Sequence, residues 1–240
     1  MRADAHYVDQ LTSRRGERAG AEAPRVDNQT RAEGQRRGDR VLAELSADIA
    51  TIYSSVELLT GETSPVARRV SLDLIRAHAW RAGWLFRAHQ ILDGAHRPHV
   101  RPRPIGPILA QVRDGLAAEC RLTGSTLTVQ VADWNAVVDA DEAGLVAGIS
   151  GAVLATLGLA ADGDGLTIRV TATIADGELR TVDITQDTVQ VGTASPDRPS
   201  NWTASLGATV AKSVAHMCGG ETAFLAGDRR GSTVRLTFRR

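Results

Sequence analysis

The sequence predicts an α+β protein in which an N-terminal helical hairpin precedes a sandwich of mostly antiparallel strands covered on one face by helices. Three observations predict this arrangement. Apolar residues recur at alternating spacings of three and four from residue 42 to 59 and again from 72 to 86, four prolines interrupt the chain between residues 93 and 107, and helical and alternating stretches follow one another after them. We therefore divide the chain into an arm (1–38), the hairpin (39–94), a linker (95–107) and the α+β domain (108–240).

The arm is rich in Arg, Glu, Asp, Ala and Gly and contains almost no large apolar residues. Such a segment cannot bury enough apolar surface to offset the entropy lost when it becomes ordered. We expect a mobile tail or a frayed helix that leads into the hairpin.

The first helix of the hairpin is expected over residues 39–60, and it carries an apolar seam with heptad spacing. A seam of this kind requires a partner helix along its whole length. Its residues are Leu42, Leu45, Ile49, Ile52, Val56 and Leu59.

The second helix is expected over residues 65–92, with Ser64 as its cap and Pro65 at its first position. It repeats the spacing with Leu72, Ile75, Ala79, Ala82 and Phe86. Because one hairpin is too small to bury two seams, we expect two copies to pair as a four-helix bundle. The alternative is a hairpin that packs on its own domain.

The remaining chain alternates between helical and strand patterns. The segment 95–107 is expected to be a stiff linker, because its prolines forbid a continuous helix. Two strand pairs are expected to form hairpins, one around Asp176–Gly177 and one around 227–231. The expected helices are 108–122, 141–159 and 204–218, and the expected strands are 127–131, 166–174, 179–184, 222–225 and 233–238.

The composition is ordinary for a soluble globular protein, with 42% hydrophobic and 23% charged residues among 240. The formal net charge is zero, so charge favours neither nucleic acid nor an anionic membrane as a partner. No apolar run approaches the roughly 20 residues of a membrane span, and the N-terminus lacks the hydrophobic core of a secretion signal. We expect a cytoplasmic protein in which Cys120 and Cys218 are reduced core thiols rather than a disulfide.

Two histidines, His78 and His89, lie on the second helix and are candidate phosphoacceptors or metal ligands. No carboxylate is found at a matching spacing, which favours surface or interface histidines. His96 and His99 are interpreted as linker residues, and we expect no metal site.

The C-terminal stretch carries three motifs of one family. Residues 206–212 resemble the glycine-rich turn and helix of kinase ATP domains, residues 216–220 resemble the kinase helix end with His-Gly-Gly, and residues 231–238 resemble the final strand that contains Gly-Ser-Thr. With the hairpin before it, the layout resembles a histidine kinase core.

A closer resemblance is to the histidine phosphotransferases of bacterial cell-cycle relays, the ChpT type. Residues 56–59 and 84–88 are similar to the ends of that family's two hairpin helices. Residues 131–134, before a helix that ends with 153–159, resemble its strand-Trp-helix passage. The resemblance covers residues 40–240 and implies a dimer with a degenerate kinase-like ATPase domain that no longer binds ATP.

The chain departs from this family at the reactive positions. The phosphoacceptor position falls on Ala43, before Glu44, or on Ala47, before Asp48, in an alternative register. Alanine has no imidazole nucleophile. At the nucleotide site, Ala155 stands where an Asn would bind Mg²⁺, Asp187 remains without its glycines, and Gly207 is the only lid glycine retained, which implies no cofactor.

The sequence therefore predicts a non-catalytic, dimeric phosphorelay protein that docks a response-regulator receiver domain through Ala43, Glu44, Ala47 and Asp48. One alternative is an active phosphotransferase that uses a displaced histidine, His78 or His89. The others are a weak nucleotide-binding regulator and a purely structural dimer.

Overall fold

The structure is a computed structural model that describes residues 23–61, 64–158, 166–186, 202–225 and 233–238. The chain divides into two units, Met1–Ala43 and Glu44–Arg240. Nearly all of the architecture below belongs to the second unit. Within the described residues, no helix is both long enough and apolar enough to cross a membrane.

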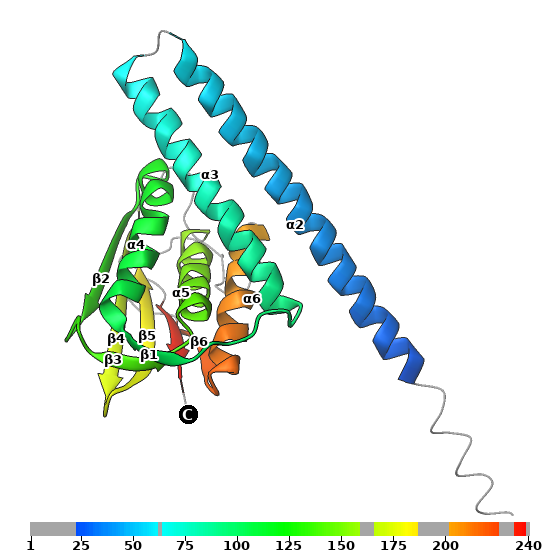
Figure 1. The fold of residues 1–240 in the computed structure, drawn as a ribbon, viewed down its shortest axis with the longest axis vertical. Coiled ribbons are helices and arrows are strands. Elements are labelled where there is room, and N and C mark those ends of the chain that lie inside the picture. Colours follow the sequence, from blue (N-terminus) through cyan, green and yellow to red (C-terminus); the bar gives the residue numbers. More distant parts are fainter. Residues whose placement is uncertain (1–22, 62–63, 159–165, 187–201, 226–232, 239–240) are drawn as a thin grey trace, which may run out of the picture. The chain divides into compact units, whose positions relative to one another are not determined.

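The hairpin consists of helices α2 (Ala23–Thr60) and α3 (Pro65–Leu92). At the start of α3, the Ser64 Oγ accepts a hydrogen bond from the Ala67 N–H at 3.2 Å, and Pro65 occupies the first turn. The predicted cap is therefore confirmed. In the second unit, the C-terminal part of α2 runs antiparallel to α3 (Figure 1).

Helix α2 begins earlier than the predicted boundary at residue 39. Residues 23–38 of the predicted arm are helical, while residues 1–22 lie outside the described part. The segment contains four Arg, two Ala and two Gln residues, which have high helix propensity even without an apolar stripe. Of the two expectations for the arm, a mobile tail or a helix that leads into the hairpin, residues 23–38 form the helix.

The main sheet has five strands in the order β2-β4-β5-β7-β6. Strands β2 and β4 are parallel, because helix α5 provides the crossover between them, and the other pairs are antiparallel. Helices α4 (Ile105–Leu122), α5 (Glu142–Leu157) and α6 (Trp202–Met217) cover one face of the sheet (Figure 1). The strands are β2 (Thr126–Val131), β4 (Thr167–Ala175), β5 (Glu178–Gln186), β6 (Glu221–Leu225) and β7 (Thr233–Thr237).

The turn between β4 and β5 is the predicted hairpin. Asp176 and Gly177 both have positive φ angles, 54° and 72°, as a two-residue type I′ turn requires. On β4, side chains alternate between buried Ile168 and Val170 and exposed Thr167 and Arg169. The buried set faces the helices, so the core lies between the sheet and the helical layer.

Two short strands were not predicted. Strand β1 (Arg101–Pro104) pairs antiparallel with β3 (Val137–Ala140) in a separate two-stranded sheet. The proline-rich segment is therefore partly a strand, and α4 begins at Ile105 rather than at residue 108. Proline is tolerated here because both strands of a two-stranded sheet are edges.

Helices α5 and α6 cross at very short range. A Cβ added to Gly151 would lie 2.6 Å from the Gly207 carbonyl oxygen, and a Cβ added to Gly207 would clash with the Gly151 carbonyl. A Cβ at Gly148 would lie 2.8 Å from Val214. The glycines thus let the backbones of α5 and α6 come into contact, and α5 is almost completely buried.

Helix α3 also packs on this helical layer. The Trp84 indole Nε1–H donates to the Ala147 carbonyl oxygen in α5 at 3.0 Å, and Trp84 is buried. In α4, Gly115 leaves room for the Trp80 ring, since any Cβ there would clash with the indole. These two tryptophans attach α3 to the domain that follows it in sequence.

Candidate functional site

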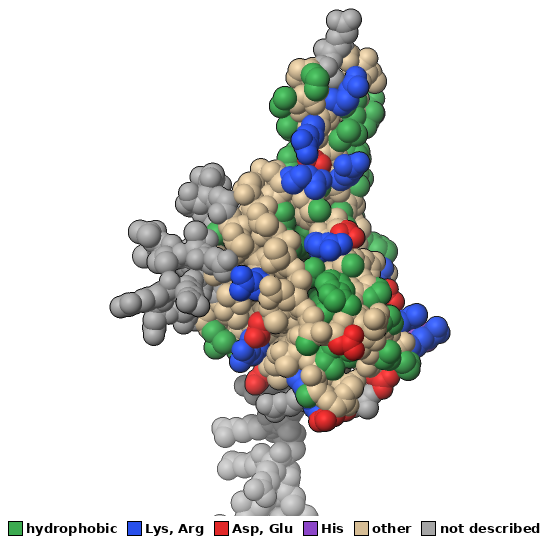
Figure 2. Space-filling model, turned by 90° about the vertical axis from the view of Figure 1, so that its left-hand side faces the viewer, with side chains coloured by type: hydrophobic (Ala, Val, Ile, Leu, Met, Phe, Trp, Pro, Cys, Tyr) green, Lys and Arg blue, Asp and Glu red, His purple; other side chains and the backbone are tan. Residues whose placement is uncertain are grey.

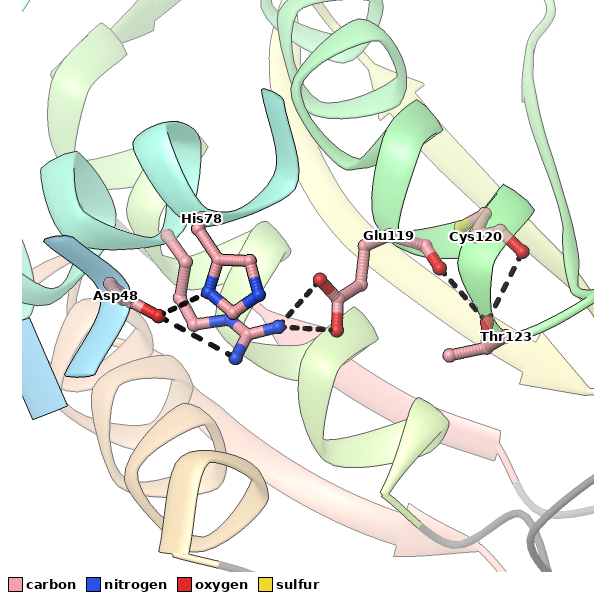
Figure 3. A network of polar contacts seen from close by, with 6 residues as sticks. Asp48, His78, Glu119, Cys120 and Thr123 are labelled. Carbon is pink, nitrogen blue, oxygen red and sulfur yellow. Dashed lines mark hydrogen bonds and ion pairs between the residues drawn. The ribbon is translucent and has the colours of Figure 1, made fainter. Parts of the chain in front are cut away.

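A group of charged side chains lies among α2, α3 and α4 in the second unit, and we call it the polar cluster. It consists of Asp48, His78, Arg81 and Glu119 (Figure 3). The His78 Nδ1 lies 2.6 Å from Asp48 Oδ1. The Arg81 Nη2 binds both Glu119 oxygens, at 2.8 and 2.7 Å, and its Nη1 lies 3.8 Å from Asp48 Oδ1. Side chains of alternating charge from three helices thus contact one another in a row.

The helical repeat places these side chains together. Asp48 and Ser55 are seven residues apart on α2 and are both buried, so they occupy the face of α2 that points toward its own chain. His78 and Arg81 are three residues apart on α3 and therefore project from the same side of that helix. Two polar side chains are therefore buried on the inward face of α2, between the half-buried Leu45, Ile52 and Leu59.

The hydrogen bond fixes the chemistry of the imidazole. Because a carboxylate only accepts hydrogen bonds, the Nδ1 of His78 carries the proton, and its Nε2 keeps the lone pair when the ring is neutral. The Asp48 side chain is 4% exposed and that of His78 is 16% exposed. Asp48 Oδ2 has no hydrogen-bond partner within the described structure. The pair is a shielded imidazole and carboxylate with limited access to solvent.

A second ion pair ties α3 to α4 beside the cluster. Asp73 is buried and receives two hydrogen bonds from Arg121, Nε to Oδ2 at 3.0 Å and Nη2 to Oδ1 at 2.7 Å. The hydrogen bond from Arg121 lowers the pKa of Asp73 below its ordinary value. This bidentate pair stabilises the attachment of the hairpin to the domain.

The apolar seam on α2 lies at the surface of the single chain. Ile49 is 62% exposed and Val56 46% exposed, and in the first unit Leu42 is 64% exposed. The other three residues of this seam are half-buried: Leu45, Ile52 and Leu59.

The seam on α3 is similar. Phe86 is 58% and Leu72 39% exposed, Ala79 is exposed and Ile75 is half-buried. At the end of the hairpin near residues 62–63, hydrophobic side chains lie beside arginines on the surface (Figure 2). The seam is therefore not buried by this chain alone.

Among solved structures, a bacterial phosphotransferase is similar to this chain, with 16% identity and a TM-score of 0.51 over 85% of this chain and 95% of the other. The two chains share a fold. The predicted α+β class with an N-terminal helical hairpin is thereby confirmed.

Two histidine kinase structures are also similar at lower TM-scores. The Acinetobacter baumannii histidine kinase AdeS has 10% identity and a TM-score of 0.49, over 82% of this chain and 98% of that one. The cytoplasmic segment of histidine kinase QseC has 10% identity and a TM-score of 0.47, over 67% and 93%. No protein-family model matches the chain, and no curated protein matches it.

The predicted docking residues occupy different environments. Ala47 is exposed, Glu44 is half-buried, and in the first unit Ala43 is exposed. Asp48 is only 3% exposed, so its carboxylate does not lie at the surface as predicted. It is drawn inward by the hydrogen bond to His78.

The expectation that the histidines of α3 lack carboxylate partners is wrong. His78 binds Asp48, and the His89 Nδ1 lies 3.2 Å from Asp93 Oδ2. The first pair is separated by thirty residues and depends on the packing of two helices. The second pair has the spacing of one helical turn and could have been found in the sequence.

The residues assigned to a degenerate nucleotide site are packed into the helices. Ala155 is 3% exposed in α5. Gly207 lies within α6, where it contacts Gly151, rather than in a lid loop. Asp187 lies outside the described residues. The role of this region in nucleotide binding stays a prediction.

The cysteines are free, as expected. Cys120 is buried and Cys218 is half-buried. Burial raises the pKa of the Cys120 thiol to about 11 and also raises the pKa of Cys218, so both are neutral thiols near neutral pH. Within the described parts of the chain, no group of three or more His, Cys, Asp or Glu residues is placed to hold a metal ion.

Proposed function

We propose that this chain is a cytoplasmic two-component phosphorelay protein of the phosphotransferase fold that dimerises and binds a response-regulator receiver domain without transferring phosphate. The observations that carry the proposal are the exposed apolar seam on α2 and α3 and the alanines at both predicted phosphoacceptor positions. A chain that shares the fold but lacks the nucleophile is suited to binding or sequestration.

The burial pattern of α2 supports the dimer. In the part of α2 that belongs to the second unit, the two fully buried residues, Asp48 and Ser55, are polar, whereas Ile49, Tyr53 and Val56 are exposed apolar residues. Removing apolar surface from water contributes about 25 cal/mol per Å² of favourable free energy. The seam of a second copy would bury this surface. Paired seams from two copies would complete the four-helix bundle.

The receiver is proposed to dock on the surface of α2 at Glu44 and Ala47. Ala47 is exposed and offers a small, flat contact without a reactive nitrogen. Asp48 lies behind this surface and supports it through His78. We therefore assign Asp48 a positioning role for α2 rather than a direct contact with the receiver.

One observation favours a second candidate, an active phosphotransferase that uses His78. The Nε2 lone pair of His78 would attack the phosphorus of a receiver aspartyl phosphate, so that an N–P bond forms, the acyl P–O bond breaks and the carboxylate leaves. Asp48 would hold the Nδ1 proton throughout, and Arg81 would balance phosphoryl charge. The 16% exposure of the His78 side chain opposes this candidate.

The test is binding of purified receiver domains, in phosphorylated and unphosphorylated form, to the full chain. We expect binding by one receiver, and Ala47→Arg should abolish it through steric clash at the proposed face. Ser54→Arg is the matched control, because Ser54 is also exposed on α2 but about two turns away from Ala47. Equal binding by both variants would overturn the docking face.

The same samples decide between the two candidates. Acid-labile phosphate on the wild-type chain, lost in His78→Ala and retained in His89→Ala, would establish phosphotransfer. Binding without any acid-labile phosphate supports the non-catalytic proposal.

A further inference from the structure

A cavity of about 370 Å³ lies between the first turn of α5 and the last turn of α6. The β4–β5 hairpin and the segment that leads into β1 complete its wall. A volume of this size is typical of sites for small organic molecules. No residue of the polar cluster or of the apolar seam is among its described lining residues, so a ligand bound here would not compete with the proposed dimer or receiver contacts.

The cavity extends from the core to the surface. Leu145, Val214 and Phe238 line it and are buried, whereas Val100 and Met217, which also line it, are exposed. A guest that entered from solvent would therefore place its surface against side chains of the core, where apolar contact with a guest is favourable.

Side chains that could form a hydrogen bond with a guest are scarce on the walls. Apart from the Cys218 thiol and three carboxylates, the described lining residues are apolar side chains and glycines. They include no hydroxyl, amide, imidazole, ammonium or guanidinium group. A guest with many polar groups would lose its hydration without gaining side-chain partners.

The three carboxylates already have partners within the chain. Asp141 Oδ2 lies 2.6 Å from His96 Nε2. Glu178 Oε2 lies 2.7 Å from Arg180 Nη1, and Asp139 also has an interaction within the chain. These acids are therefore not free to pair with a cationic guest, and no basic side chain among the described lining residues could pair with an anionic one.

The first turn of α5 holds one of these pairs in place. Asp141 precedes the helix, and a Cβ added to Gly144 would clash with its carboxylate. The side chains of His96 and Asp141 are only 8% and 10% exposed. A charged guest would have to separate this shielded pair to reach the carboxylate, which would leave a buried charge without its partner.

The cavity is distinct from the region predicted to be a degenerate nucleotide site. Gly144 and Ala155 lie in the first and last turns of α5, which are separated by about 16 Å along the helix axis. Only Gly144 lines the cavity. A ligand of this cavity therefore need not resemble a nucleotide.

We propose that this cavity binds a neutral organic molecule whose apolar body is larger than one aromatic ring. The apolar walls accept the hydrocarbon, and the absence of a free charge on the described walls disfavours an ion of either sign. The size follows from the volume, because a cavity of about 150 Å³ lined by aliphatic and aromatic side chains is sufficient for benzene.

The test uses Cys218, which lines the cavity, as the reporter. Alkylation of Cys218 in the full chain by uncharged iodoacetamide is followed by mass spectrometry at about pH 8.5, where a larger fraction of the thiol is ionised than at neutral pH. The buried Cys120 is the internal control, because its alkylation reports unfolding rather than access to the cavity.

Four probes separate charge from size. Naphthylmethanol, naphthylmethylamine and naphthoate share two fused rings and are neutral, cationic and anionic, and benzyl alcohol is the neutral probe with one ring. We expect naphthylmethanol to slow alkylation of Cys218 saturably. The two ions should need about tenfold higher concentrations, because neither finds a free counter-charge, and benzyl alcohol about fivefold higher.

Three variants locate the interaction. Val100→Trp narrows the cavity at an exposed position and should weaken protection by naphthylmethanol about tenfold. Val66→Trp is the matched control, since Val66 is also exposed but does not line the cavity, and it should leave protection unchanged. Glu178→Gln should change protection by neither the alcohol nor the amine, because this carboxylate is already paired with Arg180.

Calorimetric titration of naphthylmethanol provides an independent measurement. Saturable binding that is weakened by Val100→Trp and not by Val66→Trp supports the proposal. It would be overturned by the absence of both binding heat and protection, by an equal loss in the two tryptophan variants, or by protection from either ion that equals or exceeds that from the alcohol. A selective loss of amine protection in Glu178→Gln would also contradict it, because that carboxylate would then be available to a guest.

Discussion

His78 of α3 places its Nδ1 2.6 Å from Asp48 Oδ1 of α2, so an imidazole from one helix meets the carboxylate that follows Ala47 on the other. Asp48, the residue that follows the predicted phosphoacceptor position Ala47, therefore already has a partner within its own chain. This pair joins the two helices of the hairpin between Leu45 and Ile52 of α2, which are half-buried.

Replacing His78 by Ala should lower the free energy of unfolding by about 2 kcal/mol, because the buried carboxylate of Asp48 loses its hydrogen-bond donor. His89→Ala is the control. Its side chain is 34% exposed, and its Nδ1 has no hydrogen-bond partner within the described structure, so the loss should stay below about 1 kcal/mol. Urea unfolding followed by circular dichroism measures both, and equal losses would refute a special role for the Asp48 pair.

Glutamate at Ile49 or Val56 should prevent the proposed dimer from forming, because each would place a charge in the seam that is proposed to pair. Both residues are exposed in the single chain, 62% and 46%, so the fold should survive. Ser54 lies on the face of α2 opposite the seam, so the Ser54→Glu variant should still dimerise. Sedimentation velocity gives the oligomeric state, and a monomeric wild-type chain would end the dimer proposal.

Stability at acid pH should depend on Asp73, whose pKa is lowered by the hydrogen bond from Arg121. A depressed folded pKa contributes stability above the ordinary value of about 4, and this contribution is lost as pH falls through the lowered pKa. Asp73→Asn should therefore flatten the fall in unfolding free energy below about pH 4.

The control for this pH dependence is Asp114→Asn, whose side chain is 67% exposed beside Arg113. It should keep the wild-type slope. Denaturant unfolding at a series of acid pH values provides the measurement, and an unchanged slope in Asp73→Asn would contradict the prediction.

Alanine at Gly151 or Gly207 should destabilise the chain by about 1–3 kcal/mol, because the new methyl group has no space between α5 and α6. Gly83→Ala is the matched control on α3, where nothing lies within 4 Å of an added Cβ. It should raise stability by up to about 1 kcal/mol. Thermal unfolding distinguishes the two classes, and similar shifts in all three variants would contradict the close crossing.

Local signals in the sequence were sufficient for much of the fold. The cap at Ser64 and the turn at Asp176–Gly177 depend on residues only a few positions apart, and both are present. Strands β1 and β3 were missed because they have four residues each and one contains two prolines. Their pairing depends on a long-range contact that no local pattern encodes.

The candidate site was predictable only in part. Heptad spacing indicated the seam, whose residues are exposed or half-buried in the chain. The inward placement of Asp48 and its bond to His78 depend on the relative rotation of α2 and α3, which spacing within one helix does not determine. Burial of a charge beside an apolar seam also runs against the usual expectation for a coiled coil.

Helix α3 is held to its neighbours at Asp73, Arg81 and Trp84, by Arg121 and Glu119 of α4 and by the Ala147 carbonyl of α5. These anchors extend over about 16 Å of the helix. Rotation of α3 relative to α4 and α5 would require all three of these contacts to break. A force applied to the hairpin would therefore be transmitted through these contacts to α4 and α5, and the three helices would move together.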